Sequence, residues 1–179
     1  MKNKVISDKT INSYIGYLID AFLVSKAARF DIKGRKYIGS PAKYYFEDVG
    51  LRNARLNFRQ TEENHIMENI VYNELRIRGY RVDVGVVHQF TTNGNERNKV
   101  QLEVDFVATK GSEKYYIQSA FSMSNPDKAL QEERPLKSIG DSFKKIIVVR
   151  DNIKARRNED GLVTIGIGNF LLDENSMSM

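Results

Sequence analysis

The order of the apolar patterns after residue 60 constrains the fold more than any other feature of the sequence. Apolar side chains spaced three or four residues apart predict helices, and strict alternation predicts half-buried strands. The patterns predict a helix from about residue 60 that ends at Gly79, strands at 80–86, 100–107 and 114–121, a helix at 126–136, and strands at 144–149 and 162–167. The polar residues 91–99 are expected to form a loop around an Asn93-Gly94 turn.

The first sixty residues follow a different pattern. Ser7 is a plausible N-cap for a helix over residues 8–21, and two extended stretches follow at 23–30 and 36–46. A helix followed by a two-stranded ribbon is typical of the back half of a winged helix-turn-helix, and residues 51–59 are expected to be a connector. We therefore predict two units, a partial winged-helix-like segment over 1–60 and a second domain over 61–179.

The charge distribution separates the same two parts of the chain. The whole chain has a net charge of +5, but residues 1–60 carry 12 basic and 5 acidic side chains, whereas residues 61–179 carry 16 and 18. A basic first third is typical of a segment that meets a polyanion. Lys33, Arg35 and Lys36 lie at the expected turn of the ribbon, where such segments contact phosphates, so we predict that they bind nucleic acid. A solvated turn is the alternative.

Several classes of protein are excluded by composition. The chain has no cysteine, which excludes disulfides, thiolate metal sites and cysteine nucleophiles. It has no GxxxxGK[ST] loop, so it lacks recognisable nucleotide-binding machinery of its own. The longest aliphatic run, 146–149, is too short to span a bilayer, and no apolar stretch follows the first lysines as in a secretion signal. We expect a cytoplasmic protein with no membrane partner.

Helix, three-stranded meander, helix and strand is the core order of the PD-(D/E)XK nuclease fold. We therefore predict an α/β (α+β) protein with a restriction-endonuclease-like αβββαβ core and a mixed central sheet. In that fold a helical Glu, an Asp on the second strand and an acid-x-Lys on the third strand surround Mg²⁺. Here Glu68 lies on the first helix of the core, and Glu103 and Asp105 lie two apart on a strand, where their side chains share one face.

The third strand departs from the nuclease pattern. Gln118 stands at the acid position and Ala120 at the lysine position. An amide oxygen binds a metal ion more weakly than a carboxylate does, and alanine cannot stabilise charge on a phosphate. We predict a weakened metal set of Glu68, Asp105 and Gln118, with Mg²⁺ as the possible cofactor. A lysine supplied from elsewhere, such as Lys114 or Lys128, would be needed for catalysis, although both are more simply explained as solvated surface lysines.

A family resemblance covers nearly the whole chain. It rests on residues 7–18, 41–51 and 68–75, on Glu103-Val104-Asp105-Phe106-Val107 and on Asp160-Gly161. The most specific match is the part of 41–51 that reads Lys43-Tyr44-Tyr45-Phe46-Glu47-Asp48-Val49-Gly50-Leu51. These residues resemble the C-terminal module of prokaryotic AAA-type ATPases, which is a domain of unknown function. The resemblance implies a preceding P-loop ATPase domain, then a winged-helix segment and a nuclease-like domain. It implies the ATPase domain as a partner in cis.

Three functions follow from these observations. The first is a non-catalytic module of an AAA-type ATPase that binds DNA or a protein partner, because the acid and lysine positions are lost and residues 1–60 are basic. The second is a metal-dependent DNA nuclease with a relocated lysine. The third is a domain that only binds protein.

Overall fold

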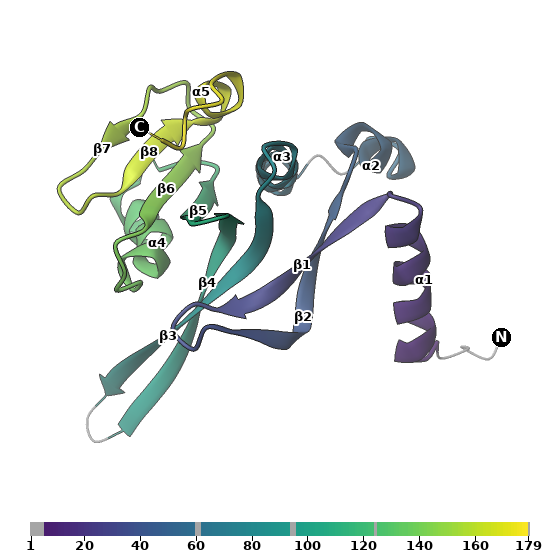
Figure 1. Cartoon of the computed structure of the whole chain (residues 1–179), viewed down its shortest axis with the longest axis horizontal. Coiled ribbons are helices and arrows are strands. Elements are labelled where there is room, and N and C mark those ends of the chain that lie inside the picture. Colours follow the sequence, from purple (N-terminus) through teal and green to yellow (C-terminus); the bar gives the residue numbers. More distant parts are fainter. Residues whose placement is uncertain (1–5, 60–61, 94–95, 124, 179) are drawn as a thin grey trace.

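The computed structural model describes residues 6–59, 62–93, 96–123 and 125–178. Its strands form one mixed sheet in the order β2-β1-β3-β4-β5-β6-β8-β7 (Figure 1). The strands are β1 (Val24–Asp31), β2 (Lys36–Phe46), β3 (Arg81–Asn93), β4 (Glu96–Lys110), β5 (Glu113–Ala120), β6 (Lys144–Val149), β7 (Arg156–Arg157) and β8 (Val163–Gly166). The helices are α1 (Asp8–Asp20), α2 (Val49–Arg55), α3 (Glu63–Ile77), α4 (Pro126–Lys137) and α5 (Ile167–Leu172). The predicted α/β class with a mixed sheet is confirmed.

The predicted core order is observed as α3, β3, β4, β5, α4 and β6. Strands β3, β4 and β5 form the antiparallel meander, and the crossover through α4 makes β6 parallel to β5. Gly79 ends α3 with a φ of 83°, a left-handed conformation that favours glycine. Asn125 caps α4 by accepting a hydrogen bond from the Asp127 N–H, with Pro126 in the first turn.

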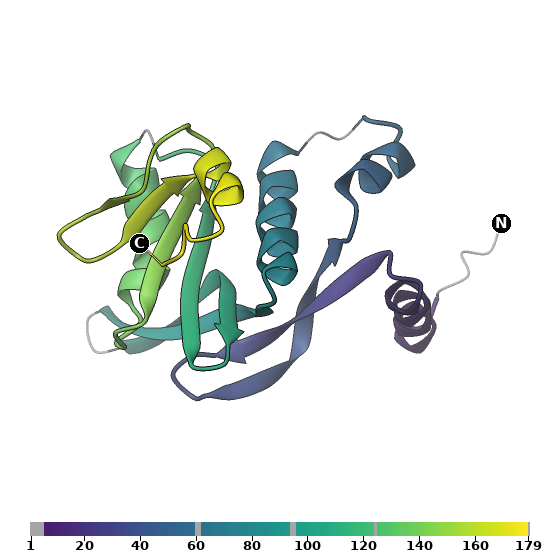
Figure 2. The same cartoon turned by 45° about the horizontal axis from the view of Figure 1, so that its top comes forward.

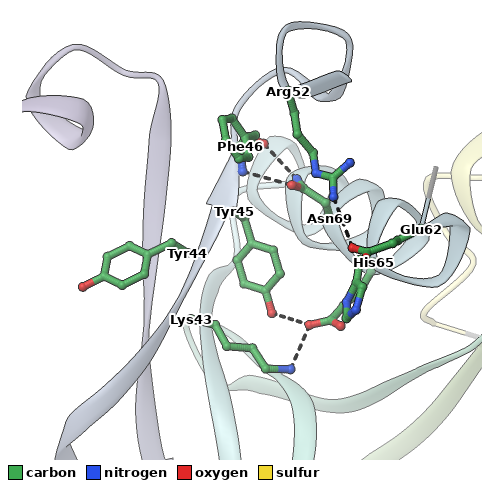
Figure 3. A pocket seen from close by; sticks show the side chains of 9 residues that line it. Lys43, Tyr44, Tyr45, Phe46, Arg52, Glu62, His65 and Asn69 are labelled. Atoms are coloured by element: carbon green, nitrogen blue, oxygen red, sulfur yellow. Dashed lines mark hydrogen bonds and ion pairs between the residues drawn. The ribbon is translucent and has the colours of Figure 1, made fainter. Parts of the chain in front are cut away.

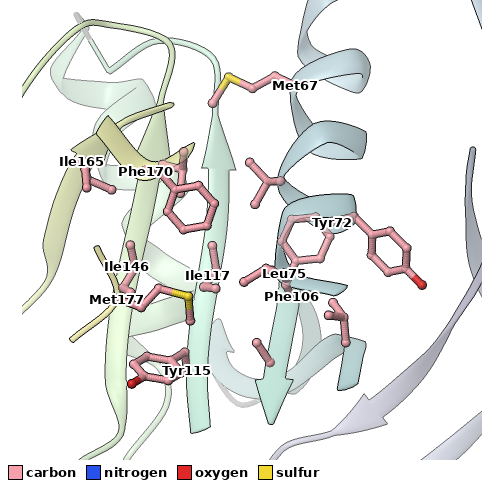
Figure 4. Packing of buried hydrophobic residues seen from close by; sticks show 14 of the residues in the cluster. Met67, Tyr72, Leu75, Phe106, Tyr115, Ile117, Ile146, Ile165, Phe170 and Met177 are labelled. Carbon is pink, nitrogen blue, oxygen red and sulfur yellow. The ribbon is translucent and has the colours of Figure 1, made fainter. Parts of the chain in front are cut away.

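Helices cover the two faces of the sheet and enclose two apolar clusters. On one face, α3 and α5 pack over β3 to β6, and Figure 4 shows side chains of α3 and Phe170 of α5 meeting there. On the other face, Leu136 of α4 and Ile139 pack against β5 and β6. Figure 2 shows α3 and α4 on opposite sides of the sheet. The strand β6 is therefore covered on both faces, which is typical of a short and wholly aliphatic strand.

The N-terminal ribbon is joined to this sheet. Strand β1 pairs in parallel with β3, where Phe30 lies opposite Gly85. A Cβ atom at Gly85 would come within 2.9 Å of the Ile32 side chain, so glycine allows the close approach of the two segments. Residues 1–60 and 61–179 thus share one sheet, and their division into two domains remains a prediction.

Two predictions about local structure were wrong. Part of the expected connector 51–59 is helical, because Asp48 accepts a hydrogen bond from the Leu51 N–H and so caps α2. The expected loop 91–99 is largely strand, since β3 and β4 pair as far as Asn93 and Glu96. The last strand ends at Gly166, and α5 begins directly after it. Gly94, the second residue of the expected Asn93-Gly94 turn, lies outside the described residues.

Helix α1 projects from the rest of the molecule. None of its residues is buried, although Ile11, Tyr14, Tyr17 and Leu18 are apolar or aromatic. Figure 1 shows α1 beyond the β1–β2 ribbon, on the side opposite β6 and β8. No helix in the part of the chain that the structure describes is long and apolar enough to cross a membrane.

A single buried amide fastens the end of β2 to α3. The Asn69 side chain accepts a hydrogen bond from the Phe46 N–H at 2.9 Å and donates one to the Phe46 carbonyl at 2.8 Å. Asn69 is 5% exposed, and the Phe46 N–H depends on its amide oxygen, whereas the Phe46 carbonyl also accepts a hydrogen bond from Asn73 at 3.0 Å. The interaction holds the ribbon against α3 close to Tyr45 and Lys43.

We predict that Asn69→Ala lowers the free energy of unfolding by about 2 kcal/mol, because it leaves the part-buried Phe46 N–H without a partner while the Phe46 carbonyl keeps Asn73. The matched control is Asn73→Ala, which removes donors to the Phe46 and Glu47 carbonyls on the same helix face but leaves the Phe46 N–H paired. Urea unfolding of the two variants measures the difference. Equal losses would show that the Phe46 N–H has no special dependence on Asn69.

Candidate functional site

The structure places the predicted nuclease-like residues on three elements. Glu68 lies on α3, Glu103 and Asp105 lie on β4, and Gln118 lies on β5. Glu68, Glu103 and Asp105 converge on one side-chain nitrogen that the sequence reasoning had not assigned to the site. That nitrogen belongs to Lys43 of β2.

The Lys43 ammonium lies among three carboxylates. Its Nζ atom is 2.9 Å from Glu68 Oε1, 2.8 Å from Glu103 Oε1 and 3.5 Å from Asp105 Oδ1. We call these four residues the Lys43 cluster. A Lys side chain has three N–H donors, so one ammonium can serve all three carboxylates. The positive charge thus lies between Glu68 and Asp105, two of the residues that the sequence analysis predicts as metal ligands.

Two further side chains complete the hydrogen bonding of the Lys43 cluster. The Tyr45 hydroxyl donates to Glu68 Oε1 at 2.7 Å, and Arg29 Nη2 contacts Glu103 Oε2 at 2.5 Å. Lys43 and Tyr45 are two apart on β2, so they point to the same face. With three carboxylates, Lys43 and Arg29, the formal charge of the site is −1.

Burial and neighbouring charges shift the pKa values of three side chains at the site. Burial, and next the negative charge of Glu68, raise the pKa of Asp105 to about 7, although Lys43 and the Ser119 N–H lower it. Burial alone would lower the pKa of Lys43, but Asp105 and Glu68 raise it above its ordinary value. Burial and Glu68 likewise raise the pKa of Tyr45. At neutral pH, Lys43 and Tyr45 are therefore protonated, and Asp105 is partly so.

Gln118 and Ala120 have structural contacts instead of the catalytic ones of a nuclease. The Gln118 amide oxygen accepts a hydrogen bond from the Asp105 N–H at 3.3 Å, and its nitrogen donates to Glu132 of α4 at 3.2 Å. Ala120 is 1% exposed and packs in the apolar cluster under α4. A lysine at position 120 would have to displace part of that cluster.

The arrangement does not fit a bound Mg²⁺ ion. Glu68 and Asp105 both face the Lys43 ammonium, and the Gln118 oxygen is engaged by a backbone N–H. Within the described ranges, no group of three or more His, Asp or Glu side chains is placed to hold a metal ion. The three predicted ligands therefore do not form an open metal site.

The two lysines suggested by the sequence lie elsewhere. Lys114 Nζ is 4.7 Å from the centre of the Phe143 ring, and Lys128 lines a hollow with Glu62 and Glu63. The lysine beside the carboxylates is Lys43, from a strand outside the predicted nuclease core.

The three predicted nucleic-acid-binding residues are exposed at the turn between β1 and β2. Lys33, Arg35 and Lys36 project there, and the Lys33 Nζ lies 3.4 Å from the His88 carbonyl. The turn is fixed by Asp31, whose Oδ1 atom accepts a hydrogen bond from the Gly34 N–H at 2.9 Å. The cations are thus held on an ordered turn.

A hollow of about 370 Å³ opens beside the Lys43 cluster (Figure 3). It is lined by Lys43, Tyr44, Tyr45, Phe46, Arg52, Glu62, His65, Glu68 and Asn69. Figure 3 shows Lys43 and Tyr45 pointing toward α3, whereas Tyr44 points away. Arg52 and Glu62 pair across the hollow at 3.6 Å. The wall holds both signs of charge, so the hollow offers no net attraction for an anion or a cation.

Lys43, Tyr45 and Arg29 are the residues that sequence reasoning missed. Lys43 and Tyr45 belong to the stretch with the most specific family resemblance, and their two-residue spacing could have placed them on one strand face. No pattern could have brought Arg29 to Glu103, because 74 positions separate them.

Two family models match consecutive parts of the chain. Residues 1–62 match a family described as Domain of unknown function (DUF8612), and residues 63–170 match Domain of unknown function (DUF4143). The boundary between the matches falls just before α3.

The chain is also similar to parts of longer proteins. An uncharacterized protein of Haemophilus influenzae is 34% identical over 93% of this chain, which spans 38% of that protein. Uncharacterized protein MJ1544 of Methanocaldococcus jannaschii is 28% identical over 92% of this chain, which spans 34% of it. The crystal structure of protein VC1899 from Vibrio cholerae is 16% identical, with a TM-score of 0.38 over 94% of this chain and 43% of that one.

The raised pKa of Asp105 predicts a specific dependence of stability on pH. The folded state binds a proton on Asp105 more tightly than the unfolded state does. Protonation of Asp105 therefore adds to the free energy of unfolding below about pH 4, and this contribution is lost as pH rises to about 7. Asp105→Asn removes this dependence. Between pH 5 and pH 8 we therefore expect the wild type to lose about 3 kcal/mol of stability relative to Asp105→Asn, because about two units of the shift fall in that range.

Urea unfolding of wild type and Asp105→Asn at both pH values measures the effect. The control is Asp127→Asn, at an exposed position near the start of α4. A pH dependence that is the same in wild type and Asp105→Asn would contradict the raised pKa.

Proposed function

We propose that this chain, which belongs to the family described as Domain of unknown function (DUF4143), is a non-catalytic nucleic-acid-binding module. The observation that carries the proposal is the Lys43 cluster, whose three carboxylates are paired with an ammonium of the chain itself. A metal-dependent nuclease needs such oxygens to hold its divalent cation. Because Lys43 occupies the space between these carboxylates, the nuclease-like core acts as a scaffold that holds the nucleic-acid-binding ribbon and performs no catalysis.

The charge distribution supports nucleic acid as the partner. Residues 1–60 carry an excess of seven basic side chains, and Lys33, Arg35 and Lys36 stand exposed at the turn of the ribbon. Among the described residues, none of these three has a carboxylate within ion-pair distance. Unpaired cations on an ordered turn suit contact with phosphates, which position a nucleic acid without reading its sequence.

We also propose that the module is attached to an AAA-type ATPase domain, on the basis of resemblance and of an exposed helix face. The chain spans 38% and 34% of the two relatives, so those proteins have room for further domains. By resemblance, the family attaches this module to an AAA-type ATPase domain. The apolar side chains of α1, none of them buried here, would supply the surface on which that domain packs.

Two other functions remain to be separated by experiment. The position of Lys43 beside Glu68 and Asp105 also suits the relocated lysine of a nuclease, and this observation favours an enzyme as the second candidate. A module that binds only protein would use the α1 face and leave the basic turn solvated.

We predict that the module binds duplex DNA and that affinity falls steeply with salt, because binding releases counterions. Replacing Lys33, Arg35 and Lys36 together by Ala should reduce the slope of log Kd against log salt concentration by about 3. Fluorescence anisotropy with a labelled duplex between about 50 and 200 mM NaCl measures both slopes.

The charge-matched control replaces Lys9, Lys26 and Lys154, which are exposed but lie away from the turn. If the control changes the slope as much as the turn variant does, the turn is not the contact. If no DNA binds at low salt, nucleic-acid binding is wrong and the protein-only function is favoured.

A cleavage assay with Mg²⁺ or Mn²⁺ separates the scaffold from the nuclease. The proposal predicts no cleavage of single-stranded or duplex DNA by the wild type. Cleavage that is lost in both Asp105→Ala and Lys43→Ala would establish an enzyme instead. Cleavage that is equal in all three proteins would indicate a contaminating nuclease.

A further inference from the structure

A second pocket lies at the basic turn, on the sheet face covered by α4. It has a volume of about 550 Å³ and is lined by Ile32, Lys33, Arg35, Lys114, Ile139, Gly140, Asp141 and Phe143. These residues come from the β1–β2 turn, the start of β5 and the segment between α4 and β6. We call it the turn pocket. Its volume lies within the range of about 300–1,000 Å³ that is usual for small-molecule sites.

The turn pocket is positively charged. It brings together Lys33, Arg35 and Lys114, and none of the three has a carboxylate within ion-pair distance in the part of the chain that the structure describes. The one carboxylate in the lining, Asp141, is already engaged. Its Oδ2 atom accepts from the Tyr116 hydroxyl at 2.6 Å, and its Oδ1 atom accepts from the Phe143 N–H at 3.2 Å.

The backbone that carries the cations of the β1–β2 turn is ordered before any ligand arrives. Ile32 is 7% exposed, and its N–H donates to the Val86 carbonyl at 3.0 Å. Arg35 has a φ of 52°, a left-handed conformation that costs energy for a residue other than glycine. Because such strain persists only where the surroundings impose it, the Arg35 backbone is fixed. A fixed backbone limits the positions that the attached guanidinium can take, so less conformational entropy is lost when it binds an anion.

An aromatic ring forms the wall of the turn pocket opposite these cations. Phe143 is 40% exposed and meets Tyr116 edge to face, with ring centres 6.5 Å apart. The Lys114 Nζ atom lies over the ring, 4.7 Å from its centre. An exposed cation–π contact is worth about 0.5–1 kcal/mol, whereas a hydrogen bond to a charged group is worth about 1.5–3 kcal/mol. A phosphate would therefore draw Lys114 off the ring and leave the ring face free.

We propose that the turn pocket binds single-stranded nucleic acid, with one phosphate between Arg35 and Lys114 and a neighbouring base stacked on Phe143. This inference rests on the proposed function and narrows its ligand. In a duplex the base faces are hidden by stacking, so only an unpaired base can reach the ring. Three cations beside an aromatic face suit this combination of phosphate and base better than they suit an acidic peptide, which offers carboxylates and no planar ring system.

The test compares a labelled oligothymidine with a duplex of the same length by fluorescence anisotropy at low salt. The wild type should bind the single strand more tightly. Phe143→Leu keeps the apolar packing but removes the aromatic face, so it should weaken single-strand binding about 10-fold, in line with about 1–3 kcal/mol for one stacked base. Duplex binding should not change. Lys114→Ala should weaken single-strand binding more than the distant Lys26→Ala does.

Tyr17→Leu is the matched aromatic control, since Tyr17 is exposed on α1, away from the turn pocket. The inference is overturned if Phe143→Leu binds the single strand as well as wild type, or if polyglutamate competes as strongly as oligothymidine. Duplex binding that still depends on the β1–β2 turn would then leave the proposed function standing. Absence of binding to either nucleic acid would overturn both.

Discussion

The structure depends on one ammonium group held among three carboxylates. Lys43 contacts Glu68 at 2.9 Å and Glu103 at 2.8 Å, and Asp105 lies 3.5 Å away. Without this charge the carboxylates of α3 and β4 would repel one another in a part-buried site. Removing one partner of a buried ion pair costs about 3–5 kcal/mol, because an uncompensated charge is left behind. Lys43 therefore stabilises the folded protein as well as forming part of the candidate site.

The same ammonium connects the two parts of the chain. Lys43 comes from the β1–β2 ribbon, whereas all three carboxylates come from the core that follows it. Together with the Asn69 amide, it holds one end of the ribbon on α3, and the opposite end carries the basic turn. A loss of Lys43 would thus loosen the element that presents Lys33 and Arg35. Under the proposed function, the Lys43 cluster anchors the ribbon that would contact nucleic acid.

The sequence predicted the core and missed the contacts that cross it. Strong periodicities gave the helices and strands from α3 to β6, because burial on one or two faces leaves a clear pattern. The polar ends of β3 and β4 were taken for a loop, since strands that extend beyond the core carry no apolar alternation. Glu68 and Asp105 could be chosen from their positions in a known order of elements. Lys43 could not be assigned to the site in this way, because its position depends on the pairing of β1 with β3, two segments far apart in the sequence.

The central claim, that Lys43 takes the place of a divalent cation, is tested most directly by melting Lys43→Ala with and without Mg²⁺. The account predicts that Mg²⁺ leaves the wild type unchanged. Lys43→Ala should melt lower by about 6–12 °C for a loss of about 3 kcal/mol, and saturating Mg²⁺ should restore part of this by binding the freed carboxylates. Lys26→Ala, with the same loss of charge at an exposed position, should show neither effect. Saturable stabilisation of the wild type by Mg²⁺, lost in Lys43→Ala, would contradict the account.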